Sequence, residues 1–431
     1  MKIGPFEFRL SRRSSEAPYD QWQNIPFFGY GATAAGVAVT SENPISHHTV
    51  FSCINVIAEG VAMLPLYPYR GRKPNQQLAT DHDLFELLTV APNPFMTAFA
   101  YFKLVIFEKL HYGKHYSLKD IDPATGRLRG LYPIERGRVL PFWYNDPETG
   151  LQRRAYRVTA PSGRNAVFLE DEIFHVQNLP ILRGAYYCLD GLSVWQHYQA
   201  ETIGGALSVE QSANSALANG AVLSGLISVK APLSDPVAKE IREQVQDRYA
   251  GPGNAGKIGV FGHDATFVRM NQTAEEAQQL ETRKFNRSVI AGILRVSAHL
   301  INDLEKATFS NIEHLDLAHY KHCLTPHLID LCQTMRKDLL TPAERETIYV
   351  EHDPTILLLG DQKTLGEVLE KGIQSARYTP NEARAISNKP PLPGGDELYI
   401  NSASVPLRQA AQGIGAKPAA EQQKRDAVDA A

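Results

Sequence analysis

The sequence predicts an α+β fold in which long helices frame a set of short antiparallel strands. Apolar residues recur with helical spacing over 49–64, 97–113, 273–296 and 310–340, whereas residues 115–177 alternate short apolar runs with turn signals. The chain has 431 residues, of which 43% are hydrophobic. It can therefore bury substantial cores, and its length favours about two or three domains.

Composition excludes several classes of protein. The four cysteines, Cys53, Cys188, Cys323 and Cys332, form no CxxC pair, which argues against a disulfide framework or a zinc ribbon and fits a reducing compartment. The first residues lack the apolar run of a signal peptide, and no later stretch has the roughly 20 apolar residues of a spanning helix. A net charge of −3 argues against tight binding of nucleic acid, because such binding depends on neutralising phosphates.

The first part of the chain predicts an arm and two core helices. Small residues dominate much of 1–45, which is typical of an arm or linker. The helix that starts at residue 49 ends before Pro65, because proline cannot continue an α-helix. Thr97 is the expected N-cap of the next helix, which runs to Gly113.

Two turn signals nearly repeat in the region of short strands. The sequence DPATG occupies 122–126 and DPETG occupies 146–150, with Pro fixing φ early in each turn and Gly supplying the positive φ at its end. Each signal predicts a β-hairpin. The apolar run at 172–176 predicts a further strand that completes this α+β domain.

Two long helices with a small insertion between them come next. The helix expected over 193–219 is poor in charge and rich in Ala, Ser and Gly, which suits close packing against identical neighbours. The second long helix is expected over 273–296. The insertion between them is expected to contain strands at 222–229, 258–261 and 266–270 and a helix at 234–249.

Capping boxes mark two helix starts. Thr273 with Glu276 opens the second long helix, and Ser310 with Glu313 opens a later helix that extends to about residue 340. Pro326 is expected to kink this later helix, because proline removes one backbone donor.

The C-terminal part carries one more strong start signal. A helix is predicted at 362–376, after which Thr379, Pro380 and Glu382 combine an N-cap, a proline at N1 and a glutamate at N3. Bulky apolar residues are scarce from 401 onward, so 401–431 is a predicted disordered tail.

One motif raises the alternative of a nucleotide-binding enzyme. Residues 251–257, GPGNAGK, satisfy GxGxxG and most of the phosphate-loop pattern, but Ile258 occupies the position where Ser or Thr would bind Mg²⁺. The predicted order, helix before the turn and strand after it, is the reverse of what phosphate binding requires. A plain turn is favoured, and no cofactor is expected.

Histidine-containing groups are weaker candidates for chemistry. His319, His322 and Cys323 lie close together on one helix and could bind a metal, but no fourth ligand is evident, so packing roles are favoured. Residues 47–48, both His, and 81–83, Asp-His-Asp, look like exposed loop residues without a neighbouring nucleophile. No catalytic residue and no metal site are predicted.

Six short segments, taken in order, carry a resemblance to a known family. They are TVFSCINVIAE at 49–59, APNP at 91–94, ETRKF at 281–285, ATFSNIE at 307–313, TPNEAR at 379–384 and PPLPGGD at 390–396. Each is weak alone, but together they resemble the portal protein family of tailed bacteriophages over roughly residues 45–400. The resemblance implies a portal-type fold with an α/β wing, a two-helix stem, a small α/β clip, a tunnel loop and a helical crown, assembled as a ring.

The resemblance also assigns these parts to stretches of the chain. It implies a flexible arm at 1–40, the wing at 41–193 and 311–359, stem helices at 194–219 and 272–297, the clip at 220–271, the tunnel loop at 298–310, the crown at 360–400 and the tail at 401–431. One departure stands out, because RVSAHL at 295–300 replaces the Gly-Val-Pro-Pro pattern that usually ends the second stem helix.

The function that the resemblance implies is mechanical rather than enzymatic. A ring of twelve copies at one capsid vertex would admit DNA pumped by a terminase motor and later release it. The implied partners are further copies of the chain, the major capsid protein, the terminase large subunit, a head–tail adaptor and double-stranded DNA, held weakly and without sequence specificity. The implied location is the portal vertex of the virion, after assembly in the host cytoplasm and without membrane contact.

Three groups of site residues follow from these parts. They are the DNA-proximal tunnel-loop residues Asn302, Asp303, Glu305, Lys306 and Thr308, the stem charges Arg283, Lys284 and Arg287, and the clip residues Lys230, Lys239, Arg242, Arg248 and Lys257, expected to dock terminase or adaptor. Mixed charge in the loop favours loose contact with DNA, and the stem charges can either pair with a neighbouring copy or face the channel. The alternative functions are a P-loop NTPase of the packaging apparatus and a non-viral ring scaffold.

Overall fold

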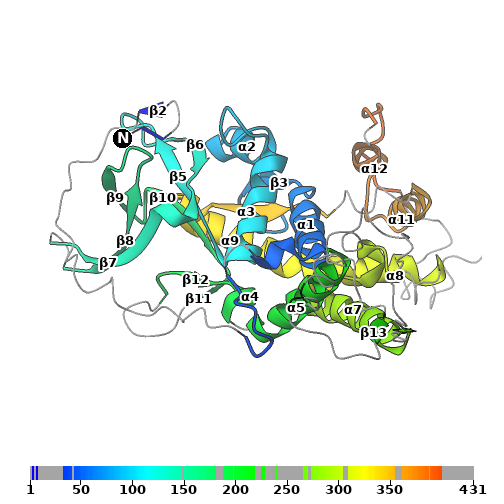
Figure 1. Ribbon diagram of the computed structural model, residues 1–431. Coiled ribbons are helices and arrows are strands. Elements are labelled where there is room, and N and C mark those ends of the chain that lie inside the picture. Colours follow the sequence, from blue (N-terminus) through cyan, green and yellow to red (C-terminus); the bar gives the residue numbers. More distant parts are fainter. Residues whose placement is uncertain are drawn as a thin grey trace, which may run out of the picture. The chain divides into compact units, whose positions relative to one another are not determined.

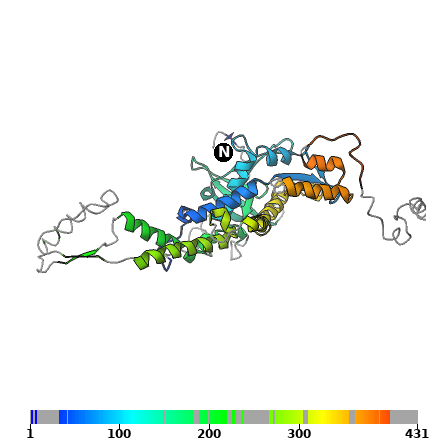
Figure 2. The same ribbon diagram turned by 90° about the vertical axis from the view of Figure 1, so that its right-hand side faces the viewer.

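A computed structural model describes most of the chain (Figure 1 and Figure 2). The described residues are 2–3, 6–7, 33–40, 43–147, 150–180, 188–197, 199–218, 225–228, 236, 239, 266–269, 273–303, 309–354, 362–387 and 389–399. The chain separates into two compact units, Met1–His352 and Asp353–Ala431. The first unit combines helices with small antiparallel sheets, which confirms the predicted mixture of helix and sheet.

Two helices form the centre of the first unit. Helix α1 (His48–Ala62) packs against α3 (Ala98–Tyr112), and both contribute to the main hydrophobic core. The Thr97 side chain caps α3 as predicted, by accepting the N–H of Ala100. Gly113 ends that helix in the left-handed conformation, with φ of 83°.

A short helix lies where the sequence indicated a loop. Helix α2 (Asp83–Thr89) begins after His82, whose Nδ1 accepts the Leu84 N–H at 3.2 Å. His82 is therefore an N-cap rather than an exposed loop residue, and its side chain is 13% exposed. The sequence analysis missed this start because His is not among the preferred N-cap residues.

The first sheet joins distant parts of the chain. Strand β3 (Leu66–Arg70) lies between β4 (Gln77–Leu78) and β15 (Ile348–His352), and both pairings are antiparallel. Because β15 comes at the end of the first unit, this sheet holds the unit's last strand against its beginning.

Two further three-stranded sheets contain the predicted hairpins. The first has the order β10 (Ile173–Gln177), β5 (Lys114–Ile121), β6 (Leu128–Pro133), and the second the order β7 (Val139–Asn145), β8 (Gln152–Thr159), β9 (Asn165–Leu169). Gly126 and Gly150 close the two predicted turns with φ of 72° and 67°. Each donates its N–H at 2.8 Å to the carbonyl of the Asp that starts the turn. Both hairpins and the added strand are therefore confirmed.

The helix expected over 193–219 is divided in the structure. Helix α4 (Val194–His197) precedes α5 (Ala200–Ala218), with the fully buried Trp195 anchoring the first of them. The second long helix, α7 (Thr273–Leu294), packs against α5, and the two run side by side in Figure 1 and Figure 2. Of the predicted insertion, strands β13 (Gly225–Ser228) and β14 (Thr266–Arg269) form an antiparallel pair.

Where a kink was expected in the later helix, the structure shows a change of helix type. Helix α8 (Phe309–His319) leads into a π-helical segment, Tyr320–Leu324, and then into α9 (Thr325–Leu339). Pro326 lies in the first turn of α9. The interruption falls just before the proline because its missing N–H cannot continue the α-helical pattern. The helix begins at Phe309, one residue before the expected cap at Ser310.

Part of the predicted arm belongs to the folded unit. Strands β1 (Lys2–Ile3) and β2 (Phe6–Glu7) form a short antiparallel pair. Val39 is buried and belongs to the main hydrophobic core. The last residues of the predicted arm therefore pack with the wing helices.

Among the described residues of the second unit, two segments are helical. Helix α11 (Gln362–Gln374) is followed by α12 (Pro380–Ile386), and the capping box of Thr379 and Glu382 is present as predicted. The predicted tail at 401–431 lies outside the described residues.

Candidate functional site

The strongest candidate site is the segment between α7 and α8, which contains the start of the predicted tunnel loop. Helix α7 ends at Leu294 because Arg295 adopts a left-handed conformation with φ of 57°. The Arg295 N–H donates to the Gly292 carbonyl at 3.1 Å and the Val296 N–H to the Ala291 carbonyl at 2.9 Å. This is the Schellman arrangement, with arginine where glycine is usual.

The same arrangement recurs a few residues later. Residues Ala298–Ile301 form a 3-10 helix where the sequence predicted a loop, and Asn302 ends it with φ of 61°. The Asn302 N–H donates to the His299 carbonyl at 3.1 Å, and the Asp303 N–H donates to the Ala298 carbonyl at 3.0 Å. Residues 295–303, which include the first six of the thirteen residues of the predicted tunnel loop, therefore form an ordered base with two consecutive helix caps. Asparagine tolerates the left-handed conformation, so Asn302 is a recognisable helix end in the sequence. Arginine is not typical of this position, so the sequence does not indicate a cap at Arg295.

Side chains from the following helix hold this base in place. His299 Nε2 lies 2.7 Å from Asp316 Oδ1, and the Cys323 thiol donates to the Leu294 carbonyl at 3.3 Å. The His319 imidazole is hydrogen-bonded to the backbone of Arg295. Burial lowers the pKa of His319, the neighbouring His299 lowers it further, and the bond to Arg295 opposes both. The last carbonyls of α7, which a helix leaves without partners, are thus satisfied by α8 and the π segment.

These contacts reassign the residues that were candidates for a metal site. His319 and Cys323 are buried and cap α7, whereas His322 is exposed. The favoured packing role therefore applies to the first two residues. In the part of the chain that the structure describes, their ligand atoms do not gather into a group that could hold a metal.

The stem charges lie on an exposed stretch of α7. Arg283 and Lys284 are exposed, Arg287 is partly buried, and Phe285 between them is 69% exposed. The next two turns of the helix are buried: Ile290, Ala291 and Leu294 belong to the main core. Helix α7 is therefore rooted in the core at its C-terminal end and presents charge and an exposed aromatic ring toward its N-terminal end.

The remaining predicted site residues are described only in part. At the end of the loop base, Asn302 is exposed and Asp303 is partly buried. Lys239 has a helical backbone and is exposed. The other predicted site residues lie outside the described residues: Glu305, Lys306, Thr308, Lys230, Arg242, Arg248 and Lys257. The phosphate-loop-like turn at 251–257 and Ile258 also lie outside them.

A second polar cluster fixes the chain where it enters α4. No motif in the sequence predicts this cluster. The buried Asp190 carboxylate accepts the Tyr116 hydroxyl at 2.8 Å and the Gly191 N–H at 2.9 Å, and it pairs with the Lys114 ammonium. Burial, and then the Asp190 charge, raise the pKa of Tyr116. His175 bonds Tyr156 at 3.1 Å beside this cluster, and burial lowers its pKa well below the usual value. The cluster ties strands β5, β8 and β10 to the approach to the long helices.

Comparisons with known proteins agree with this architecture. Residues 48–388 match the family model described as phage portal protein. The chain is 25% identical over 375 residues to the portal protein of Enterobacteria phage HK97, covering 86% of this chain and 85% of that protein. It is 24% identical over 386 residues to the probable portal protein of Streptomyces phage phiC31, covering 88% and 81%.

Solved structures share the fold. A chain in the virion of a native gene transfer agent particle matches with a TM-score of 0.53 and 20% identity, over 81% of this chain and 92% of that one. A chain in the neck of the native particle, computed with C12 symmetry, matches with a TM-score of 0.52, 20% identity and the same coverage. Among the described helices, none is both long and apolar enough to cross a membrane.

Proposed function

This chain belongs to the phage portal protein family, and from that premise we propose that it assembles into a ring of twelve copies, the conduit for genome packaging and ejection at one capsid vertex. The observation that carries the proposal is the family match over 48–388, which spans the described wing, stem and second-unit helices. The C12 symmetry applied to the neck of a structurally similar particle supports twelve as the subunit number.

The parts of the ring are proposed from the resemblance to portal proteins. The wing corresponds to 41–193 with 311–359, the stem to α5 and α7, the clip to 220–271 and the crown to 360–400. Helices α5 and α7 suit a stem because their packed ends contribute Ile203, Ala206 and Ile290 to the wing core. The exposed Phe285 and its neighbouring charges are then available to adjacent copies or to the channel.

The loop between α7 and α8 is the proposed constriction of the channel. Its base, 295–303, is fixed to α8 through His299 and Asp316, so that the position from which residues 304–308 depart is set by the wing. Mixed charge at Asp303, Glu305 and Lys306 supports weak, sequence-independent contact with double-stranded DNA rather than a grip.

The proposed partners outside the ring are the major capsid protein at the wing, and the terminase large subunit and a head–tail adaptor at the clip. Cationic clip residues such as Lys239, which is exposed, are the candidates for docking these partners. Assembly in the host cytoplasm would precede incorporation at the virion's portal vertex.

The test is a direct measurement of assembly. Purified protein at micromolar concentration should give closed rings with a central hole in negative-stain images, and a mass by light scattering of about twelve chains. A stable monomer at that concentration would contradict the proposal. Hydrolysis of ATP by the parent protein that Lys257→Ala abolishes would instead favour the NTPase alternative.

A further inference from the structure

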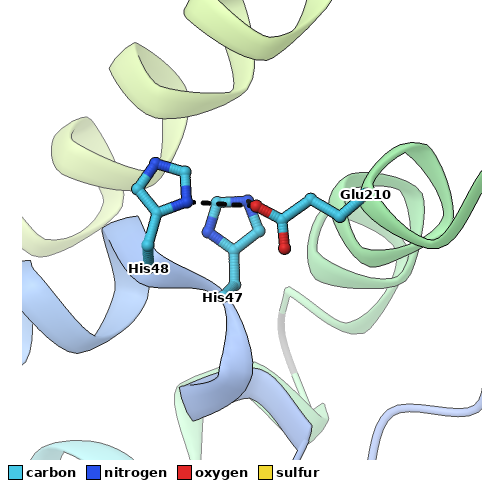
Figure 3. A group of neighbouring side chains, drawn as sticks. All are labelled: His47, His48 and Glu210. Carbon is cyan, nitrogen blue, oxygen red and sulfur yellow. Dashed lines mark hydrogen bonds and ion pairs between the residues drawn. The ribbon is translucent and has the colours of Figure 1, made fainter. Parts of the chain in front are cut away.

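His47, His48 and Glu210 converge where α1 begins beside α5 (Figure 3). His48 Nδ1 lies 3.1 Å from Glu210 Oε1, and His47 Nε2 lies 3.5 Å from the same oxygen. Within the described residues, this is the one place where three His, Cys, Asp or Glu side chains bring their ligand atoms within 4.8 Å of one another. The sequence alone favoured no chemistry for the two histidines, because they looked like exposed loop residues without a neighbouring nucleophile.

The structure also corrects the expectation that both histidines are exposed loop residues. The His47 side chain is 4% exposed, because it serves as the N-cap of α1 and packs beneath His48. The two rings stack with centroids 5.0 Å apart and an angle of 13° between their planes. His48 remains 66% exposed, so the cluster is open to solvent on one side.

Glu210 reaches the histidines from the turn of α5 that follows buried residues. Ile203, Ala206 and Leu207 are buried in the core, and Glu210 follows on the same face, four residues after Ala206. Its side chain is 26% exposed.

The distances are compatible with metal coordination, although the 3.1 Å between His48 Nδ1 and Glu210 Oε1 also lies within the N–H···O range. A separation of 3.5 Å between His47 Nε2 and Glu210 Oε1 exceeds the usual N–H···O range. In tetrahedral coordination with bonds of about 2.0–2.1 Å, ligand atoms are separated by about 3.4 Å. The two measured separations, 3.1 and 3.5 Å, bracket that value.

The ligand types are also suitable. Two imidazoles and one carboxylate form a three-ligand set that zinc takes with water in the fourth position. The second nitrogen of His48, Nε2, lies 3.1 Å from the Thr49 hydroxyl, an outer contact that orients a ligating ring.

Two features must change for a metal to bind. The ring planes are within 13° of parallel, and each nitrogen lone pair lies in its own ring plane, so one imidazole must turn before both can bind a single ion. One hydrogen bond must also be given up. His47 Nδ1 accepts the Thr49 N–H at 3.3 Å, which places the proton of the neutral ring on Nε2. Coordination through Nε2 moves that proton to Nδ1 and gives up the contact with Thr49. At 3.3 Å this hydrogen bond is already long, so its loss is a small penalty compared with forming a metal–ligand bond.

We propose that His47, His48 and Glu210 bind one zinc ion, or a divalent ion with the same ligand preference, with water as the fourth ligand. The ion would join the start of α1 to the turn of α5 that follows the buried Ala206 and Leu207. Its role is structural: it would add an anchor between the two helices.

Cobalt is the probe that tests this site, because four-coordinate Co²⁺ absorbs visible light much more strongly than the hydrated ion. The full chain, prepared without a histidine tag and stripped with a chelator, is titrated with Co²⁺ and then with Zn²⁺. We expect one Co²⁺ per chain with the strong visible absorption, its displacement by Zn²⁺, and a thermal unfolding midpoint that rises with Zn²⁺ and falls again with chelator.

Three variants make the outcome specific. Glu210→Gln and His48→Gln remove one ligand each from partly or largely exposed positions, and His47→Asn removes a ligand while retaining a good N-cap. Each should weaken Co²⁺ binding at least tenfold, whereas His322→Gln, at an exposed histidine outside the cluster, should not. The proposal is wrong if the parent lacks the absorption band at micromolar Co²⁺, or if Glu210→Gln and His48→Gln bind as the parent does.

Discussion

The side-chain amide of Asn381 links α12 to the proline-rich segment that follows it, because its Nδ2 donates to Asp396 Oδ1 at 2.8 Å and to the Leu392 carbonyl at 3.0 Å. Its Oδ1 accepts the Leu392 N–H at 2.8 Å. Gly395 approaches this amide so closely that a Cβ there would lie 2.4 Å from Oδ1. The TPNEAR and PPLPGGD segments therefore form one structural feature.

Asn381→Asp should release the proline-rich segment from α12. The aspartate can still accept the Leu392 N–H, but it has no N–H to donate to Asp396 or to the Leu392 carbonyl, so two hydrogen bonds are lost. Its carboxylate would also face that of Asp396, which adds a repulsion. We expect local destabilisation of about 2–3 kcal/mol, at roughly 1 kcal/mol for each hydrogen bond. Faster hydrogen exchange of the Leu392 amide would show it. Glu367→Gln, at an exposed residue of α11, should leave that exchange unchanged.

Gly113→Ala should be among the most destabilising single changes in the wing. Gly113 has φ of 83°, and a Cβ there would lie 2.3 Å from the Leu192 carbonyl carbon. We expect a loss of more than about 4 kcal/mol in the free energy of unfolding, or failure to fold. Gly126→Ala is the matched control: its φ is 72° with nothing within 4 Å of the added Cβ. It should cost about 1–2 kcal/mol, and similar losses for both variants would contradict the close approach.

Acid should destabilise the wing through His327. Burial, followed by the nearby Lys109 ammonium, lowers the pKa of His327 to about 4, although Asp330 opposes this. The unfolded chain binds the proton near pH 6.5 and the folded chain does not, so stability is complete above pH 6.5 and declines until about pH 4. The decline from this residue is at most about 3 kcal/mol.

The measurement is denaturant unfolding at several pH values. His327→Gln should show a shallower loss of stability between pH 6.5 and 4 than the parent, whereas His322→Gln should retain the parental slope. His175 and His319, whose pKa values burial also lowers, leave a residual decline in the His327 variant. Equal slopes in the parent and His327→Gln would show that His327 titrates normally.

Asp316→Asn should loosen the base of the proposed tunnel loop without unfolding the protein. The carboxylate lies 2.7 Å from His299 Nε2 and is 57% exposed, so the global cost should be no more than about 1 kcal/mol. Amide exchange at 298–303 should accelerate, whereas exchange in α9 should not. Unchanged exchange at the loop base would mean that Asp316 does not hold it.

Deleting residues 305–308 should separate assembly from packaging. Ring formation depends on wing and stem packing, so it should persist, whereas packaging or retention of DNA should fall because the constriction is altered. Imaging of rings and the length of packaged DNA in assembled particles measure the two effects. Normal packaging and retention would place the constriction elsewhere, and loss of rings would show that these residues are structural.

Local chemistry made much of the wing predictable. Thr97, Gly126 and Gly150 each act through their own backbone neighbourhood, and the structure confirms all three. Arg295 has a left-handed conformation and its backbone is hydrogen-bonded to His319 of α8, a contact that no local motif predicts. Glu210 meets His47 only because the fold brings α5 to the start of α1, a contact across 163 positions that no spacing rule reveals.

The π-helical segment before Pro326 absorbs one extra residue, so that one continuous rod keeps the same side buried before and after it. In α9, Leu328, Leu331 and Met335 repeat with ordinary helical spacing, and Leu324 continues that line backward. His319 and Cys323 are also four apart, but they lie one residue out of phase with it. In the π turn an N–H bonds the carbonyl five residues back rather than four, as that of Thr325 does with Tyr320, so His319 lines up with Leu324 and Cys323 with Leu328. One side of the rod therefore serves both the loop base and the main core, and an ordinary α-helical turn of the same residues would put the two halves out of phase.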